Sequence, residues 1–210
     1  MPKPYTPNDA WSRKAAQEGY RARSVYKLME LDERFHLLKP GQTVLDLAAA
    51  PGSWLQYASK RIGPKGLAIG FDLTPIKPIA PNVITIQTDI SDIKNMNSSI
   101  ESLLKQHTFL TSLTSQTSRT FDLVLSDIAP STSGIRDVDQ WRSIELNQAV
   151  LAIAERWLKS GGHCVLKVFR GADFDAFLRE VKTQWKDVRI ATPRASRDRS
   201  KEVYLVMRKP

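Results

Sequence analysis

The sequence predicts a doubly wound α/β fold, in which a mostly parallel sheet of about seven strands carries helices on both faces. Three observations lead to this prediction. Short apolar runs alternate with segments whose apolar residues recur every three or four positions. Turn residues separate these segments. Four aspartates also come at or just after the ends of four successive apolar runs. Strands that alternate with helices are typical of parallel sheets, which bind ligands beyond the carboxyl ends of their strands.

The expected elements follow from these periodicities, taken along the chain. We expect strands at Thr43 to Leu47, Leu67 to Phe71, Val83 to Gln87, Phe121 to Ser126 and His163 to Phe169, and near 187–192 and 202–208. We expect helices from Lys14 to Leu38, Pro51 to Lys60, Ser91 to Gln106, Val138 to Ser160 and Asp173 to Gln184. In the first helix, leucines and a phenylalanine recur at helical spacing up to Leu38, and Pro40-Gly41 ends it.

Length and composition predict a single domain over residues 1–210. The proline-rich residues 1–12 are interpreted as an irregular arm, and the Ser/Thr-rich residues 107–120 as a surface insertion. The single cysteine, Cys164, excludes an intrachain disulfide and a multi-cysteine metal site, and we expect no metal. No apolar run is as long as a membrane span, which favours an intracellular, cytoplasmic protein, with an organelle as an alternative.

The stretch from Val44 to Trp54, V-L-D-L-A-A-A-P-G-S-W, organises the chain. It reads as a strand, a turn of small residues and a helix start, where a ligand can approach the backbone closely. An ordinary strand–helix junction has the same appearance. The turn lacks the G-x-G-x-x-G pattern of dinucleotide sites and contains only Gly52, which counts against an NAD-type oxidoreductase.

Four acidic residues, Asp46, Asp72, Asp89 and Asp127, are expected at one edge of the sheet. A single aspartate there is ordinary turn chemistry, but four at equivalent positions favour a ligand with hydroxyls, amino groups or positive charge. S-adenosylmethionine fits on chemical grounds, because it offers ribose hydroxyls, an adenine amino group, an ammonium and a sulfonium, and needs no pyrophosphate cradle. Its carboxylate would suit the helix start near Gly52.

The net charge of +9 and the sequence pI of about 9.7 favour a polyanionic partner, with nucleic acid ahead of an anionic membrane. Residues 186–210 hold eight Lys or Arg against three acidic residues. The candidate RNA contacts are Arg21, Arg23, Arg194, Arg197, Arg199 and Lys201. A basic face that is simply solvated is the alternative.

Five motifs in order resemble the RrmJ/FtsJ family of S-adenosylmethionine-dependent RNA ribose 2′-O-methyltransferases. They are R-A-R-S-V-Y-K-L, D-L-A-A-A-P-G-S-W, S-D-I-A-P-S-T-S-G, V-L-K-V-F and A-S-R-D-R-S-K-E-V-Y. The resemblance covers residues 12 to 207 and implies a Rossmann-like methyltransferase fold. Two positions depart from the family pattern, because Ala48 and Ser53 stand where glycines are usual.

The resemblance implies a catalytic tetrad of Lys27, Asp127, Lys167 and Glu202. It also implies cofactor contacts from Gly52, Trp54, Asp72, Asp89 and Asp127, while Ser53 is placed to donate to the cofactor carboxylate. Methyl transfer to a 2′-OH needs alignment and the removal of one proton. Lys167 is the candidate base if it is neutral; alternatively a charged Lys167 orients the hydroxyl while Asp127 accepts the proton.

Within the family, both large-subunit ribosomal RNA and tRNA anticodon loops are substrates. The compact size favours ribosomal RNA, with an assembled ribosomal particle supplying further recognition, and tRNA is the alternative. A catalytically inactive RNA-binding relative is less consistent with an intact tetrad. We expect a monomer.

Overall fold

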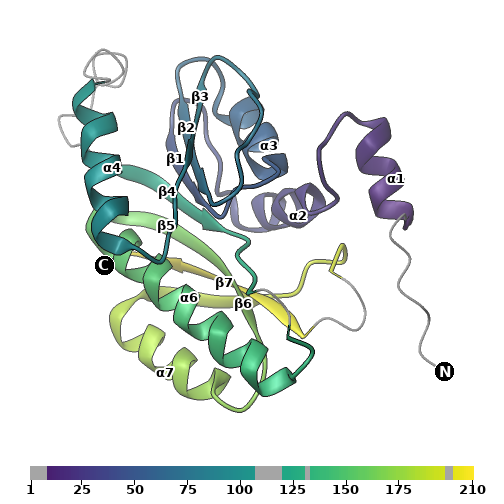
Figure 1. Cartoon of the computed structure of the whole chain (residues 1–210), viewed down its shortest axis with the longest axis vertical. Coiled ribbons are helices and arrows are strands. Elements are labelled where there is room, and N and C mark those ends of the chain that lie inside the picture. Colours follow the sequence, from purple (N-terminus) through teal and green to yellow (C-terminus); the bar gives the residue numbers. More distant parts are fainter. Residues whose placement is uncertain (1–8, 107–119, 131–132, 197–200) are drawn as a thin grey trace.

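The computed structural model describes residues 9–106, 120–130, 133–196 and 201–210 (Figure 1). Its strands are β1 (Thr43–Leu47), β2 (Leu67–Asp72), β3 (Val83–Gln87), β4 (Phe121–Ser126), β5 (Leu158–Phe169), β6 (Lys186–Ala191) and β7 (Glu202–Arg208). Its helices are α1 (Ala10–Gln17), α2 (Val25–Phe35), α3 (Ser53–Ile62), α4 (Ile93–Gln106), α6 (Arg136–Trp157) and α7 (Phe174–Gln184).

The described strands form one seven-stranded sheet in the order β3-β2-β1-β4-β5-β7-β6. Each pair from β3 to β5 is parallel, and β7 is antiparallel to both of its neighbours. The strand order reverses between β1 and β4, so a crevice forms at the carboxyl ends of these two strands. The predicted fold class is confirmed.

Helices cover both faces of the sheet, and alternate residues of each strand supply the two cores. On one face Leu45 and Leu47 of β1 belong to the same apolar cluster as residues of α4, α6 and α7. On the other face Val44 packs with α2 and α3, for example with Leu28 and Leu55. This alternation follows from the two-residue period of a strand.

The predicted continuous helix from Lys14 to Leu38 is wrong, because two helices occupy this region. α1 ends at Gln17, and Gly19 follows with a φ of +76°, a left-handed conformation that glycine adopts without strain. α2 then begins at Val25. The start of α1 also corrects the expected arm, since residues 10–12 are helical and the Asp9 carboxylate accepts a hydrogen bond from the Ser12 backbone N–H at 2.8 Å.

The boundary between α6 and β5 also differs from the expectation. The helix ends at Trp157, and the strand begins at once, with Leu158 paired to Phe121 of β4. The Gly161-Gly162 pair, which predicted a break, lies inside β5 where the register with β4 shifts. The predicted insertion at 107–120 falls outside the described residues except for Thr120. In the described part of the chain, every helix is too short or too polar to cross a membrane.

Candidate active site

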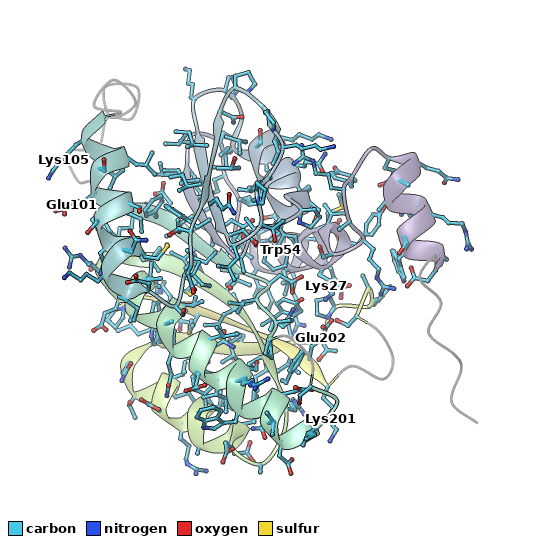
Figure 2. All side chains as sticks on the ribbon, viewed as in Figure 1. Lys27, Trp54, Glu101, Lys105, Lys201 and Glu202 are labelled. Carbon is cyan, nitrogen blue, oxygen red and sulfur yellow. The ribbon has the colours of Figure 1, made fainter. Side chains whose placement is uncertain are left out.

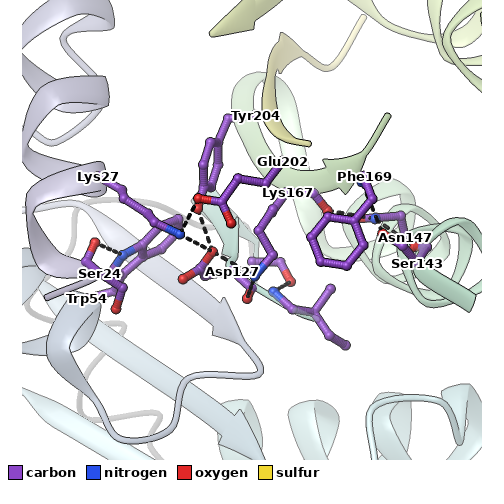
Figure 3. Close-up of polar contacts among 12 residues, drawn as sticks. Ser24, Lys27, Trp54, Asp127, Ser143, Asn147, Lys167, Phe169, Glu202 and Tyr204 are labelled. Carbon is purple, nitrogen blue, oxygen red and sulfur yellow. Dashed lines mark hydrogen bonds and ion pairs between the residues drawn. The ribbon is translucent and has the colours of Figure 1, made fainter. Parts of the chain in front are cut away.

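Four charged side chains from four different elements meet at the carboxyl edge of the sheet (Figure 3). Lys27 comes from α2, Asp127 follows β4, Lys167 lies near the end of β5, and Glu202 begins β7. Nζ of Lys27 lies 2.7 Å from Oε1 of Glu202 and 3.9 Å from Oδ1 of Asp127. Nζ of Lys167 lies 3.1 Å from the same Asp127 oxygen. The structure thus brings together all four residues of the predicted tetrad.

The register of β5 and β7 explains part of this arrangement. Lys167 pairs with Tyr204, and Phe169 pairs with Glu202. Residues two apart on a strand share a face, and directly opposed residues share it too. Lys167, Glu202 and Tyr204 therefore project to one side of the sheet, which is the side that α2 covers.

Burial makes the ion pairs of this cluster necessary. Only 8% of Lys27, 5% of Lys167 and 8% of Glu202 is exposed. Buried charges are unfavourable unless they are paired and hydrogen-bonded. Burial, the largest single influence, would raise the pKa of Glu202, but the charge and hydrogen bond of Lys27, the Ser196 hydroxyl and the charge of Lys167 together outweigh burial and lower the pKa. Glu202 is therefore a carboxylate that fixes Lys27, and it is not a proton donor near neutral pH.

Tyr204 completes the cluster, although the sequence analysis gave no role to this last residue of the final motif. Its side chain is fully buried, and its hydroxyl donates a hydrogen bond of 2.6 Å to Oδ1 of Asp127. Burial, followed by the charges of Asp127 and Glu202, raises the pKa of Tyr204 well above its usual value. Tyr204 therefore keeps its proton and holds one carboxylate oxygen in place. Its position two residues after Glu202 on the same strand is the sequence signal that could have identified it.

Polar residues of α6 hold the strand that carries Lys167 (Figure 3). The pairing of β4 with β5 ends at Ser126 and Leu166. Beyond this point, the Asn147 side-chain amide donates to the Lys167 carbonyl at 2.7 Å, and the Phe169 N–H donates to the Ser143 hydroxyl at 3.3 Å. These side chains replace the backbone partners that β4 no longer supplies, and they hold the end of β5 that carries Lys167.

A cleft of about 770 Å³ lies beside the tetrad, and Asp127 is part of its wall. It extends over the carboxyl ends of the strands and is lined by Ala48, Ala50, Asp72, Leu73, Asp89, Ile90, Ser91, Asp127, Ile128, Ala129, Pro130, Arg142, Glu145, Leu146 and Ala149. Asp72 and Asp89 therefore stand in one cavity, as predicted from their strand-end positions. Hydrogen bonds from Ser91 lower the pKa of Asp89, which keeps it ionised. Among the described residues, no group of His, Cys, Asp or Glu side chains is placed to hold a metal.

The family is identified by comparison with known proteins. The sequence profile of the FtsJ-like methyltransferases matches residues 20–210. The chain belongs to this family. A protein of Bdellovibrio bacteriovorus named ribosomal RNA large subunit methyltransferase E is 45% identical over 202 residues, 96% of each chain. A protein of the same name from Syntrophobacter fumaroxidans is 43% identical over 203 residues, 96% of this chain and 95% of its own.

Solved structures agree with this assignment. A Plasmodium falciparum protein described as a ribosomal RNA methyltransferase aligns with a TM-score of 0.76 at 28% identity. The alignment covers 90% of the present chain and 98% of the Plasmodium chain. The FtsJ-like chain therefore shares its architecture with this structure over nearly the whole length.

The turn after β1 shows why this FtsJ-like chain keeps Gly52. Its φ is +98°, and a Cβ atom there would lie 2.8 Å from Ile79 and 3.1 Å from the Arg21 guanidinium. Ser53 and Trp54 follow at the start of α3 and are buried. The Ser53 hydroxyl lies 2.9 Å from the Ser24 hydroxyl, and the Trp54 indole N–H donates to the Ser24 carbonyl at 2.7 Å. These two predicted cofactor contacts tie α3 to α2.

A small cavity of about 40 Å³ joins this turn to the tetrad. Ser24, Ser53, Trp54 and Asp127 are among its lining residues, together with Asp46. Asp46 lies within β1, only 1% exposed, and its Oδ2 has no hydrogen-bond partner among the described residues. Burial, with the charges of Asp127 and Asp72, raises the pKa of Asp46 well above its usual value. Asp46 is therefore protonated over a wider pH range than an exposed aspartate.

The six predicted RNA contacts divide into three groups. The Arg21 guanidinium donates to the carbonyls of Pro51, Lys77 and Pro78, at 3.1, 2.8 and 2.7 Å, and so braces the turn at Gly52. Arg23 contacts the Asp9 carboxylate and the Ala195 carbonyl.

Arg194 and Lys201 are exposed. The Arg194 backbone N–H donates to the Glu30 carboxylate at 2.7 Å. Arg197 and Arg199 lie outside the described residues.

Proposed function

We propose that this protein transfers a methyl group from S-adenosylmethionine to a ribose 2′-OH of large-subunit ribosomal RNA. The observation that carries the proposal is the meeting of Lys27, Asp127, Lys167 and Glu202 beside the large cleft. The names of the bacterial relatives support ribosomal RNA as the substrate. The motif resemblance supports the ribose 2′-oxygen as the acceptor.

S-adenosylmethionine fits the cleft by chemistry and size. Cofactor sites of a few hundred cubic ångströms that combine apolar walls with a few polar groups are typical of such ligands. Asp72 and Asp89 would accept hydrogen bonds from ribose hydroxyls and the adenine amino group, and Ala48 and Ala50 keep the wall close to the ligand. When bound, the cofactor supplies an activated methyl group on a positively charged sulfur. The protein then has to align the hydroxyl and manage one proton.

The contacts of Lys167 suit the role of base. Its Nζ donates to the Asp127 backbone carbonyl at 2.7 Å and lies 3.1 Å from Oδ1 of the same residue. In this proposal Lys167 acts as a neutral amine whose two hydrogens are held by these oxygens, so that its lone pair is left for the 2′-OH. Nζ would take the proton of the 2′-OH during the transfer, and the Asp127 carboxylate would stabilise the resulting ammonium. Tyr204 donates to Oδ1 of Asp127 and leaves the second carboxylate oxygen, so the alternative in which Asp127 takes the proton and a charged Lys167 orients the hydroxyl is kept.

Lys27 and Glu202 have a different role in this proposal. They form the shortest ion pair of the site, at 2.7 Å, and Lys27 also lies 3.9 Å from Asp127. The Lys27 ammonium fixes both carboxylates and is placed to orient the 2′-oxygen.

We infer that the substrate is presented on an assembled large ribosomal particle, which would supply further recognition of the RNA; the names of the relatives, which refer to the large ribosomal subunit, support this inference. A tRNA anticodon loop is the alternative substrate. We propose a cytoplasmic location for the reaction, with an organelle as the alternative.

The proposal is tested by supplying methyl-labelled S-adenosylmethionine together with large ribosomal subunits, deproteinised ribosomal RNA or tRNA. We expect label in the large-subunit RNA, with the subunit as the best acceptor. Label in tRNA alone would contradict the ribosomal assignment, and label in no RNA would contradict RNA methylation. A Lys167→Ala variant is assayed in the same way and should lose the label. Lys182→Ala, which removes an exposed lysine of α7, is the matched control and should behave as the wild type.

A further inference from the structure

A second cleft, of about 410 Å³, borders the tetrad and shares no lining residue with the large cleft of about 770 Å³. It is lined by Arg170, Gly171, Thr192, Lys201, Glu202 and Val203. Glu202 belongs to this second cleft, whereas Asp127 belongs to the first. The tetrad therefore borders both clefts, and Lys27 connects Glu202 of the second cleft with Asp127 of the first.

Two cations from neighbouring strands form the rim of the second cleft. Arg170 follows β5 and Lys201 precedes β7, and the Arg170 backbone N–H donates to the Lys201 carbonyl at 2.9 Å. The Arg170 guanidinium lies 5.5 Å from the ring centroid of the buried Phe174, which supports its position. Figure 2 shows Lys201 next to Glu202, on the same side of the molecule as Lys27.

Between Arg170 and Lys201 the wall of the cleft is formed by backbone atoms, because Gly171 has no side chain. A Cβ atom at this position would lie 2.3 Å from Oε1 of Gln140, whose side chain is buried beneath it. A larger residue would have to displace the Gln140 side chain. The cleft therefore combines an open backbone wall with two positively charged side chains, a combination suited to a phosphodiester.

The chemistry of the substrate demands an anion at this place. In RNA the carbon that bears the 2′-OH is bonded to the carbon that bears the 3′-phosphodiester. A ribose that reacts at the tetrad therefore brings a phosphate close to Glu202. The two lysines of the tetrad are engaged with carboxylates. Among the described residues, Arg170 and Lys201 form no ion pair with a carboxylate, which leaves their charge for the phosphate.

We propose that the cleft formed by Arg170, Gly171 and Lys201 binds the RNA phosphodiester adjacent to the target ribose. This inference rests on the proposed function and adds the position of the RNA strand to it. Arg170 is not among the residues that the sequence motifs indicated. Its role is to hold the backbone on the side of the tetrad away from the methyl donor.

The double variant Arg170→Ala/Lys201→Ala tests the inference, with Arg179→Ala/Lys182→Ala as the control. The control removes an arginine and a lysine from the exposed surface of α7 and so changes the net charge equally. Binding of a short single-stranded RNA is measured as a function of salt. Affinity falls as salt rises, and loss of two phosphate contacts should make the plot of log affinity against log salt less steep by about 1.4. If the variant and the wild type bind equally at 1 M salt, this change in slope means that the variant binds about 25-fold more weakly than the wild type at 0.1 M salt.

Turnover provides a second readout. We expect the KM for large ribosomal subunits to rise in the cleft variant, while the affinity for S-adenosylmethionine stays at the wild-type value and the control behaves as wild type. An unchanged salt slope with unchanged KM would overturn the cleft assignment even if the wild type methylates RNA. If the wild type methylates no RNA, the proposed function fails, and the salt slope still decides whether this cleft binds RNA.

Discussion

The side-chain amide of Asn147 donates a 2.7 Å hydrogen bond to the backbone carbonyl of Lys167. The same amide donates to the Ser143 carbonyl at 2.8 Å, and Asn147 is fully buried. One side chain of α6 thus fixes the backbone of a proposed catalytic residue at the point where its strand has lost its neighbour. The position of the Lys167 amine depends on a helix that contributes no member of the tetrad.

Asn147→Leu is expected to separate this positioning role from simple stability. Leucine has a similar volume but leaves the Lys167 carbonyl unpaired, which should lower the free energy of unfolding by about 1–3 kcal/mol. Because small misplacements of reacting groups slow catalysis, we expect kcat to fall by roughly tenfold or more while the KM for S-adenosylmethionine stays near the wild-type value. Denaturant unfolding and steady-state kinetics measure both effects. A destabilised variant with unchanged kcat would show that Asn147 only supports the fold.

Lys167→Ala is expected to remove the base without removing the cofactor site. Lys167 does not line the large cleft, so the affinity for S-adenosylmethionine should be nearly unchanged. A positioned base contributes about 10²–10⁴-fold to a rate, and turnover should fall by that amount. Calorimetric titration of the cofactor and single-turnover methylation are the measurements. Turnover at the wild-type rate would exclude Lys167 as the base.

Asp46→Asn is expected to change how stability depends on pH. The raised pKa of Asp46 means that the folded protein keeps a proton that the unfolded chain releases above about pH 3.9. This contribution to the free energy of unfolding is complete below that pH and is lost as pH rises towards the folded-state pKa, by about 1.4 kcal/mol per pH unit. Asparagine cannot titrate, so the variant should gain stability relative to wild type as pH rises.

Unfolding titrations from acidic to neutral pH measure this difference. Asp137→Asn, which changes an exposed carboxylate in the first turn of α6, serves as the control. A difference between wild type and Asp46→Asn that does not vary with pH would mean that Asp46 titrates alike in the folded and unfolded protein.

Arg21→Ala is expected to weaken cofactor binding more than RNA binding. The guanidinium holds three backbone carbonyls around the Gly52 turn and the segment after β2. Because these hydrogen bonds are exposed to solvent, each contributes at the low end of the usual range, and the variant should lose about 1 kcal/mol of stability. The salt slope of RNA binding should be unchanged, as for the control Lys65→Ala. A shallower slope would instead make Arg21 a phosphate contact, as its basic surroundings in the sequence suggest.

The sequence predicts the elements that depend on contacts between residues close together in the chain. It misses features that depend on contacts between distant residues. The strands of the parallel sheet are short, apolar and bounded by turn residues, and Thr43–Leu47, Val83–Gln87 and Phe121–Ser126 were predicted to the residue. The break at Gly19 was missed because a lone glycine inside an amphipathic pattern is compatible with a helix. Its left-handed conformation lets Arg21 reach carbonyls about 30 and 57 residues away, which local periodicity cannot reveal.

The candidate site also combines residues that the sequence predicts with residues that only the structure reveals. Family motifs indicated the four charged residues, and the structure brings these together. Tyr204 was within reach of sequence reasoning, since it shares a strand face with Glu202. The roles of Asn147 and Ser143 could not be predicted, because polar residues on a long helix ordinarily face solvent. They find partners on β5 only because β4 stops pairing with β5 at Ser126. Arg170 acquires a role only when the cleft beside Glu202 is seen.

The chemical position of the transferred methyl group tests the central proposal most directly. Large ribosomal subunits are methylated with labelled S-adenosylmethionine, and the extracted RNA is hydrolysed with alkali, which needs a free 2′-OH at each linkage that it cleaves. We predict label in an alkali-resistant dinucleotide in the wild type and its loss in Lys167→Ala. Label recovered in mononucleotides would place the methyl group on a base and would contradict ribose 2′-O-methylation.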